Sequence, residues 1–323
     1  MKRIIMNTLK WAKLEANYNN RNILCVIASM IVNYLLYGVF PQEYFHFGFY
    51  KLNSAQKKTF FTTKEYARCR KKYSIPSYEE AIFFDKWIFS KVFSEYFGRG
   101  IIRIGSETKE QEILSFISNS TGSRFVYKPN KSHEGIGIKT IDINYKDDST
   151  VLLQLKALPE GLLEEWIVQS NKMNDLYPNG VNCIRVYTFI QDGVVSFLDA
   201  KVTFGVTSNI VNATLGNNLF ALVDVKSGVV ISDLANYDME VYKEHPVTGF
   251  TSKGLQLPMW REVLELVEKS ARIVPQVAYV GWDIALTERG PILIEGNHCG
   301  GSGGNQFSVL RTDSKGIKDI WYR

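Results

Sequence analysis

Apolar positions recur in short alternating runs along the last two thirds of the chain, a pattern typical of half-buried strands. Several runs are separated by turn residues, among them Asp192-Gly193, a dipeptide typical of a tight hairpin. Amphipathic helices are predicted over residues 107–118 and 260–274, so this part of the chain reads as mixed α+β. The predicted strands cover residues 124–128, 136–143, 162–168, 184–191, 194–204, 219–225, 229–232, 280–286 and 291–295.

The first 98 residues follow a helical pattern instead. A helix is predicted over residues 64–68, and a second begins at Pro76 and continues through an aromatic segment to Phe97. Gly98 and Gly100 then interrupt the helical pattern, and we expect a subdomain boundary there.

A largely apolar stretch extends from Ile23 to Phe40 within this helical region. It falls short of the roughly 20 residues that span a bilayer, and its position does not fit a signal peptide. The favoured interpretation is a buried helix in an N-terminal cap. Peripheral membrane contact through Lys10, Trp11 and Lys13 stays open as an alternative.

Composition narrows the class of protein. The 323 residues are 45% hydrophobic and 22% charged, with a net charge of +5, which is typical of a globular protein that binds small anions. The basic run Arg68-Cys69-Arg70-Lys71-Lys72 reads as a solvated helix face, so nucleic acid is not expected as a partner. The four cysteines lack the C-x-x-C spacing of a zinc site, and a reducing cytoplasm is the expected compartment.

The most informative residues lie in the last predicted hairpin. Antiparallel pairing about a tight turn brings Asp283 and Glu295 side by side among apolar neighbours. Two such carboxylates are costly to bury unless a cation neutralises them. Asn297 can add a neutral oxygen, and this hard oxygen set predicts a Mg²⁺ site. A salt-bridged carboxylate pair at a sheet edge is the less favoured alternative.

Two further motifs are weak when taken alone. Lys128 ends a strand beside a polar loop that reaches Gly135, an arrangement that can hold nucleotide phosphates. The strand containing Glu164, Glu165 and Trp166 can line an adenine pocket, although each motif also fits an ordinary exposed strand.

Together, in this order, the three motifs resemble the ATP-grasp superfamily, and more closely its group associated with sugar transfer and surface-polysaccharide gene clusters. Supporting segments are Phe84-Asp85-Lys86, Val181 to Val186, His245 to Gly249 and Val280-Gly281-Trp282-Asp283. The resemblance implies an ATP-grasp fold in which two α+β subdomains clasp ATP behind an N-terminal helical cap. The implied regions are a helical cap over residues 1–98, a lid with a mobile phosphate loop over residues 99–168 and a core over residues 169–323.

The resemblance also implies roles for individual residues. Asp283, Glu295 and Asn297 would hold Mg²⁺, and Lys201 would be a second phosphate-binding lysine. An arginine often precedes the first metal-binding Asp in the superfamily. That position is occupied here by Val280-Gly281-Trp282, so Arg185 is expected to stabilise phosphoryl transfer from a neighbouring strand, with a structural salt bridge as the alternative. The expected ATP-binding residues are Lys128, Ser132, His133, Gly135, Gly137, Glu164, Glu165, Trp166 and Ile167.

Three residues are candidates for substrate contact: His245, His298 and Gln306. Local hydrogen bonding is the alternative for the two histidines, and a flexible glycine-rich loop is the alternative around Gln306.

The implied reaction is ATP-dependent amide formation through an acyl-phosphate, between a sugar acid or other glycan-related carboxylate and a small amine. A kinase acting on a sugar or lipid hydroxyl, with His245 or Asp199 as base, stays open, as does a non-catalytic nucleotide-binding regulator. The expected location is cytoplasmic, with membrane association open, and no oligomeric state is predicted.

Overall fold

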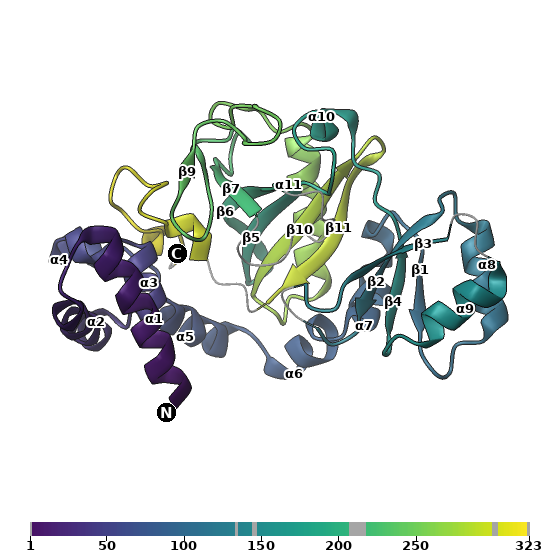
Figure 1. Cartoon of the computed structure of the whole chain (residues 1–323), viewed down its shortest axis with the longest axis horizontal. Helices are drawn as coiled ribbons and strands as arrows, with labels where there is room; N and C mark the ends of the chain where they lie inside the picture. The colour runs from purple at the N-terminus through teal and green to yellow at the C-terminus, as the bar shows by residue number, and fades with distance from the viewer. Residues whose placement is uncertain (1, 133–134, 144–146, 207–217, 299–302, 322–323) are drawn as a thin grey trace.

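The computed structural model describes residues 2–132, 135–143, 147–206, 218–298 and 303–321. Helices within residues 2–73 form one end of the molecule, a seven-stranded sheet forms the middle, and a four-stranded sheet forms the other end, with the helix of residues 86–92 beside it (Figure 1). We call the larger sheet the core sheet and the smaller one the lid sheet.

The core sheet is antiparallel, in the order β11-β10-β5-β6-β7-β8-β9. Helix α11 (Trp260–Ile273) turns a strongly apolar side onto it, and their shared core includes Val263, Val267 and Trp282. The sheet consists of β5 (Cys183–Gln191), β6 (Val194–Gly205), β7 (Asn218–Val223), β8 (Leu234–Ala235), β9 (Val241–Tyr242), β10 (Tyr279–Thr287) and β11 (Gly290–Asn297).

The lid sheet has the order β1-β4-β2-β3 and is also antiparallel. Helices α8 (Glu110–Asn119) and α9 (Asp148–Lys156) cover it, and they bury Ile113 and Leu155 against Phe125 and Leu163. Strand β4 ends three residues earlier than the predicted end at Val168. The sheet consists of β1 (Ile101–Ile104), β2 (Arg124–Pro129), β3 (Lys139–Asp142) and β4 (Gly161–Glu165). The regional boundaries at residues 98 and 168 stay a prediction.

The helix predicted from Pro76 to Phe97 is not continuous, so this prediction was wrong. It is divided into α6 (Pro76–Tyr78), a π-helical turn (Glu79–Phe83), α7 (Lys86–Val92) and a short 3₁₀ turn (Ser94–Tyr96). Asp85 leaves the helical conformation and its side chain accepts the Ile88 N–H at 3.0 Å, which starts α7. The same carboxylate accepts a 2.9 Å hydrogen bond from Asn130 of the lid, so a contact distant in sequence fixes the break.

The remaining N-terminal elements form a helical layer against one end of the core sheet. They are α1 (Lys2–Asn19), α2 (Ile23–Tyr37), α3 (Pro41–His46), a 3₁₀ turn (Phe49–Lys51), α4 (Ser54–Lys57) and α5 (Thr63–Tyr73). The C-terminal segment adds a 3₁₀ turn (Gly303–Gln306) and α12 (Lys318–Trp321), and α10 (Asn171–Asn174) follows the lid.

Helix α2 corrects the favoured interpretation of its sequence. Only Val26, Met30 and Asn33 are buried in it, while Leu24, Leu35 and other apolar side chains point outward. The prediction of a buried helix was therefore wrong for its outer side. Within the described residues, no helix is long and apolar enough to cross a membrane.

Candidate functional site

The carboxylate cluster of Asp283, Glu295 and Asn297 lies where β10 and β11 pair. Asp283 is directly opposite Glu295, as predicted, and Asn297 is opposite Gly281. The pairing shifts register just after Asp283, which lets two residues of β11 face one residue of β10. The hairpin thus brings two carboxylates and an amide together at one end of the core sheet.

Arg185 meets this cluster from β5, the next strand of the sheet. It is paired in register with Asp283, and its Nε and Nη2 donate to the two carboxylate oxygens at 2.6 and 2.5 Å. Asn297 Nδ2 donates to the same carboxylate at 3.0 Å. Burial opposes the guanidinium charge, but Asp283 more than compensates and raises the pKa of Arg185 well above its usual value. The structure therefore contains the salt bridge within a sheet that the sequence left open for Arg185.

Glu295 differs from Asp283 because it makes no hydrogen bond or ion pair within the described residues. The side chain of Lys86 is the nearby cation. The negative charge of Glu295 acts to raise the pKa of the Lys86 ammonium. Among those residues no group of three or more His, Cys, Asp or Glu side chains is placed to hold a metal. The available set is instead two carboxylates and one amide. These are hard oxygen donors with only one directly bonded arginine, and they fit a Mg²⁺ ion.

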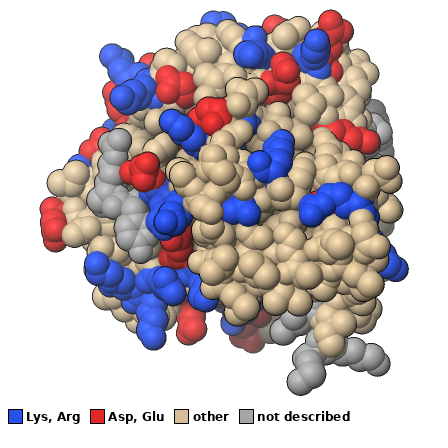
Figure 2. Space-filling view, turned by 90° about the vertical axis from the view of Figure 1, so that its left-hand side faces the viewer, with Lys and Arg blue, Asp and Glu red and all other residues tan. Residues whose placement is uncertain are grey.

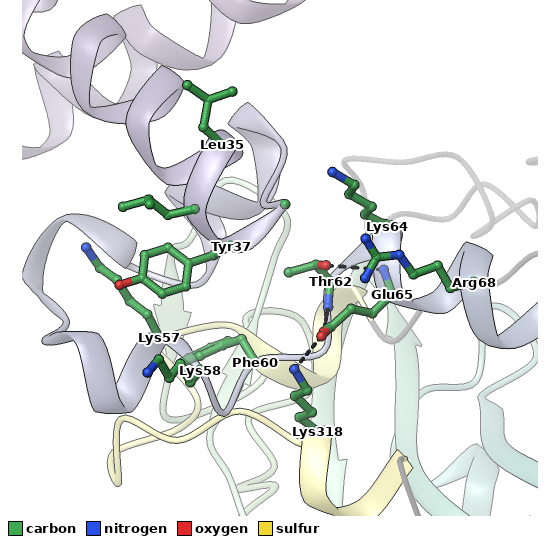
Figure 3. Close-up of a pocket in the computed structure, with 12 residues that line it drawn as sticks. Leu35, Tyr37, Lys57, Lys58, Phe60, Thr62, Lys64, Glu65, Arg68 and Lys318 are labelled. Atoms are coloured by element: carbon green, nitrogen blue, oxygen red, sulfur yellow. Dashed lines mark hydrogen bonds and ion pairs between the residues drawn. The ribbon is translucent and has the colours of Figure 1, made fainter.

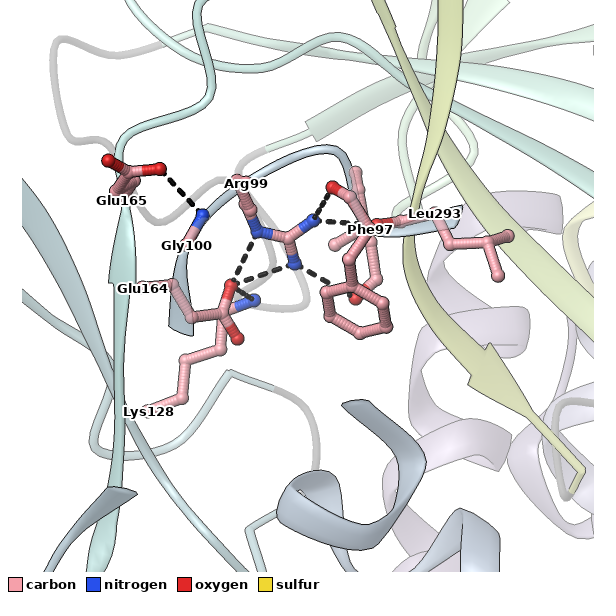
Figure 4. A network of polar contacts seen from close by, with 8 residues as sticks. Phe97, Arg99, Gly100, Lys128, Glu164, Glu165 and Leu293 are labelled. Atoms are coloured by element: carbon pink, nitrogen blue, oxygen red, sulfur yellow. Dashed lines mark hydrogen bonds and ion pairs between the residues drawn. The ribbon is translucent and has the colours of Figure 1, made fainter. Parts of the chain in front are cut away.

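A second polar network lies at the junction of the two sheets (Figure 4). Lys128, on β2, donates to Glu164 Oε2 at 2.8 Å, and Arg99 donates to the same oxygen through Nε and Nη2 at 3.0 and 2.8 Å. Burial opposes the carboxylate charge, but the two cations outweigh it and lower the pKa of Glu164 to about 2. Glu164, expected in the adenine hinge, thus has its carboxylate held between two cations.

Arg99 was missed in the sequence, although it links the lid sheet to the core sheet. Besides Glu164, it donates to the carbonyl oxygen of Leu293 on β11 at 2.7 Å. The chain reaches this position through Gly98, whose φ is +57° and whose missing Cβ would lie 2.5 Å from Ile292 Cγ2. Only the placement of Arg99 between two glycines at the boundary could have indicated a special role.

Lys86 is a second missed residue, at the start of α7. Its Nζ donates to the Ser132 carbonyl, which connects α7 to the phosphate loop. Burial and the nearby Lys128 lower the pKa of Lys86, whereas Glu295 and Glu164 act in the opposite direction. Lys86 therefore lies in the electrostatic field of both networks. The Phe84-Asp85-Lys86 segment was the available sequence signal.

The remaining predicted ATP-binding residues flank these networks. Ser132 Oγ donates to the Pro129 carbonyl at 3.1 Å, and Gly135 and Gly137 both have positive φ. Glu165 accepts the Gly100 N–H at 2.6 Å. Trp166 and Ile167 follow β4 outside any strand, with the Arg124 guanidinium 5.2 Å from the Trp166 ring. His133 lies outside the described residues.

Lys201 lies beside Arg185 on the core sheet, opposite it in the β5–β6 register, and is 5% exposed. Burial opposes its charge, but the nearby Tyr187 and Tyr237 hydroxyls raise the pKa of Lys201. Lys201 in turn lowers the pKa of Tyr237. A cation held in this way is suited to an anionic ligand.

Two further residues lie on this side: Asp199, which the sequence offered only as a base for the kinase alternative, and Asn305, which it did not single out. Burial raises the pKa of Asp199 to about 6, even though Arg311 acts to lower it from 3.8 Å away. Asn305 is fully buried beside Asp199, and its side-chain hydrogen bond to Asp199 acts to lower the pKa of that carboxyl.

The structure does not bring the predicted substrate residues together. His245 is buried, with Nε2 bonded to the Gly205 carbonyl and Nδ1 facing Thr248, so both ring nitrogens serve a local turn. Gln306 is bonded through both side-chain polar atoms to the Phe61 backbone. Both side chains therefore satisfy buried backbone groups, and their predicted role in substrate contact stays a prediction.

His298 lies nearer the cluster, directly after Asn297. Its ring packs edge-on against Phe84 at 4.5 Å, and its carbonyl accepts the Tyr66 hydroxyl at 2.5 Å. Its predicted role in substrate contact stays a prediction.

Comparison with known proteins adds to this geometry. A family model described as sugar-transfer associated ATP-grasp matches residues 70–313. No curated protein matches the chain. Together with the two antiparallel sheets, the family match confirms the predicted family and the α+β ATP-grasp fold.

Similar solved structures include N5-carboxyaminoimidazole ribonucleotide synthetase bound to ADP, with 9% identity and a TM-score of 0.43 over 69% of this chain. D-alanine–D-alanine ligase from Bacillus anthracis has 15% identity and a TM-score of 0.40 over 75% of this chain and 66% of its own. VanG D-Ala:D-Ser ligase from Enterococcus faecalis has 14% identity and a TM-score of 0.42 over 73% of this chain and 57% of its own. The chain spans 46% of the length of the synthetase.

Proposed function

Because the chain belongs to the sugar-transfer associated ATP-grasp family, we propose that it is an ATP-dependent carboxylate–amine ligase. The observation that carries this proposal is the carboxylate cluster beside Arg185, Lys201 and Lys86, where a hard cation and phosphate groups find opposite charges close together. The names of the similar enzymes, all of them ligases or synthetases, support the same class.

In this proposal Asp283, Glu295 and Asn297 hold Mg²⁺, which supplies neutralisation of the phosphate charge. Lys128, Lys86 and Lys201 bind phosphate oxygens of ATP, and Glu165, Trp166 and Ile167 line the adenine. Arg185 neutralises Asp283 when no metal is present. With a cation held there, the Arg185 guanidinium would be available to the transferring phosphoryl group, where positive charge is most effective.

The γ-phosphoryl group of ATP moves to a substrate carboxylate and gives an acyl-phosphate and ADP. An amine then attacks the acyl carbon, an amide forms and phosphate leaves. Asp199 and Asn305 are our candidates for the acceptor side, because a carboxyl with a pKa near 6 can take the proton that the amine loses. The family's association with sugar transfer favours a sugar acid or related glycan carboxylate as one substrate.

A kinase that phosphorylates a sugar or lipid hydroxyl is the second candidate. The observation that favours it is the same Asp199, a carboxylate on β6 two residues before Lys201 that could accept a hydroxyl proton. The two reactions share the metal and phosphate residues but differ in the acceptor, and only the ligase releases free phosphate.

The deciding experiment measures ADP and phosphate with paired sugar acids and amines. The ligase produces both only when carboxylate and amine are present together, whereas the kinase produces ADP with a hydroxyl acceptor and no free phosphate. Asp283→Asn and Glu295→Gln should each lower turnover roughly 100-fold or more, since each removes charge from the metal site. Glu268→Gln, on the exposed side of α11, is the matched control and should leave turnover unchanged. Full activity in the first two variants would refute the metal assignment.

A further inference from the structure

The outer side of helix α2 is apolar although it is exposed. No charged residue occurs from Ile23 to Tyr37, and the few buried residues all lie on the inner side. A surface helix normally turns polar residues outward. We call the outer side the apolar face. Its members, with their exposed fractions, are Leu24 (72%), Ile31 (53%), Val32 (51%), Leu35 (73%) and Leu36 (68%).

Neighbouring α1 extends this surface. Its Ile5, Met6 and Leu9 are also exposed, and Lys10 and Lys13 on the same helix are exposed basic residues. Viewed from this end, the molecule has a broad area without charge, with Lys and Arg along its border (Figure 2). Contiguous exposed apolar surface of this kind marks a binding surface for a protein or a membrane.

A basic pocket adjoins the C-terminal end of the apolar face. Its accessible volume is about 260 Å³, and Leu35 and Leu36 line it on one side (Figure 3). The one acidic lining residue, Glu65, is paired with Lys318. Among the described residues, the side chains of Lys58 and Arg68 make no hydrogen bond or ion pair. The basic lining residues are Lys57, Lys58, Lys64, Arg68 and Lys318.

We propose that this end of the protein docks onto the surface of an anionic phospholipid bilayer. The apolar face enters the boundary between headgroups and acyl chains, and the basic pocket receives lipid phosphate. The 15 residues of α2 extend about 22 Å, less than the roughly 30 Å hydrocarbon core, so the helix lies along the surface.

Charge distinguishes a bilayer from a second copy of the chain. A two-fold interface centred on the apolar face would bring the same surface of each copy together, including the basic pocket at its end. Like charges would then lie close to one another. An anionic membrane instead supplies the negative charge that Lys58 and Arg68 lack.

Docking at this end also holds the proposed active site near the membrane. His46, which ends α3, bonds through Nε2 to the Tyr237 carbonyl at 2.9 Å, and the Tyr237 side chain interacts with Lys201. The Gln306 side chain, from the C-terminal segment, makes a second link by bonding the Phe61 backbone of the N-terminal helical layer. The proposal does not depend on the ligase reaction, because its evidence lies outside the carboxylate cluster.

Vesicle co-sedimentation of the full chain tests the proposal, with phosphatidylcholine vesicles that either contain or lack phosphatidylglycerol. We expect binding only to the anionic vesicles, weakening as salt is added. Leu35→Glu with Leu36→Glu should reduce binding at least tenfold, since acyl contacts are replaced by charge. Lys58→Glu with Arg68→Glu should reduce it more than tenfold, because each lost basic residue costs roughly fivefold.

Matched controls lie elsewhere on the molecule. Leu153→Glu changes an equally exposed leucine on α9, and Arg261→Glu changes an exposed arginine on α11, so both should bind like wild type. Thermal unfolding and ATP binding check that each variant is folded. The proposal fails if wild type binds neither vesicle type, binds neutral vesicles equally, or forms a dimer that the leucine variant dissociates. None of these outcomes affects ADP formation in solution. The ADP and phosphate assay therefore tests the ligase proposal independently of the membrane proposal.

Discussion

The lid carboxylate Glu164 and the core carboxylate Asp283 are both buried and both bonded to an arginine, yet their surroundings differ. Glu164 receives two cations, Arg99 and Lys128, on a single oxygen. Asp283 receives one arginine and an amide, and a second carboxylate, Glu295, faces it across the hairpin. The lid network has excess positive charge, whereas the core network has excess negative charge.

This difference indicates what each network can bind. Surplus positive charge at Lys128 suits phosphate oxygens, and surplus negative charge at Asp283 and Glu295 suits a metal ion. ATP bound with Mg²⁺ carries both kinds of charge and would bridge the two networks. The comparison therefore predicts that changes to Glu164 mainly affect stability, whereas changes to Asp283 mainly affect chemistry.

Glu164→Gln should give the largest effect on stability. It leaves Arg99 and Lys128 buried without their counter-charge, which costs about 3–5 kcal/mol of unfolding free energy. Asp283→Asn should cost roughly 1–2 kcal/mol, because Arg185 keeps 25% of its side chain exposed to water. Urea unfolding of the two variants measures both values. If the two variants lost equal amounts of unfolding free energy, the lid and core networks would not differ in how strongly they stabilise the fold.

Asp199→Asn should have the next largest effect, and one that depends on pH. Burial raises the pKa of Asp199 from 3.8 to about 6, so the folded protein keeps this proton longer than the unfolded chain does. As the pH rises from about 4 to above 6, ionisation of Asp199 therefore lowers the free energy of unfolding, by up to about 3 kcal/mol. The variant should be more stable than wild type at slightly alkaline pH and no different below about pH 4.

Calorimetric unfolding at both pH values measures this difference. A variant that is less stable at alkaline pH would show that Arg311 and Lys201 hold the Asp199 carboxylate favourably. That outcome would remove the reason to regard Asp199 as a base.

Magnesium alone should give the smallest of these effects. At a concentration ten times its Kd, a ligand that binds only the folded state stabilises it by about 1.4 kcal/mol. We expect Mg²⁺ to stabilise the wild-type protein by this amount and to give no such stabilisation in Asp283→Asn or Glu295→Gln. Glu165→Gln is the matched control and should leave this stabilisation intact, since among the described residues that carboxylate bonds only the Gly100 N–H of the lid. A gain that persists in Asp283→Asn would place the metal elsewhere.

The sequence was informative where a feature depends on neighbouring residues. The tight turn at Glu288-Arg289-Gly290 places β10 and β11 side by side, as predicted, and the register shift after Asp283 then sets Asp283 opposite Glu295. The hairpin at Asp192-Gly193 was predicted for the same reason. Helix α11 followed from its own apolar pattern.

Features that depend on distant residues were not predictable in this way. The break at Asp85 depends on Asn130, and the position of Arg99 depends on carbonyls of β11. His245 and Gln306 looked suited to substrate because their side chains are polar and lie in loops. Their substrate role stays a prediction, but their hydrogen bonds to buried backbone groups, which for Gln306 lie 245 residues away, could not be read from local patterns.

By itself the sequence indicated the family from its motifs, and it determined the turns that form the hairpins and the closeness of the two metal-site carboxylates, because turns and hairpins follow from short spacings. Only the tertiary structure decided that Arg185 neutralises Asp283, that Arg99 ties the lid to the core and that the outer side of α2 stays exposed. Each of these depends on which surfaces meet after the chain has folded. The energy of such contacts comes from burial and from charges brought together across long separations in sequence, which local patterns do not encode.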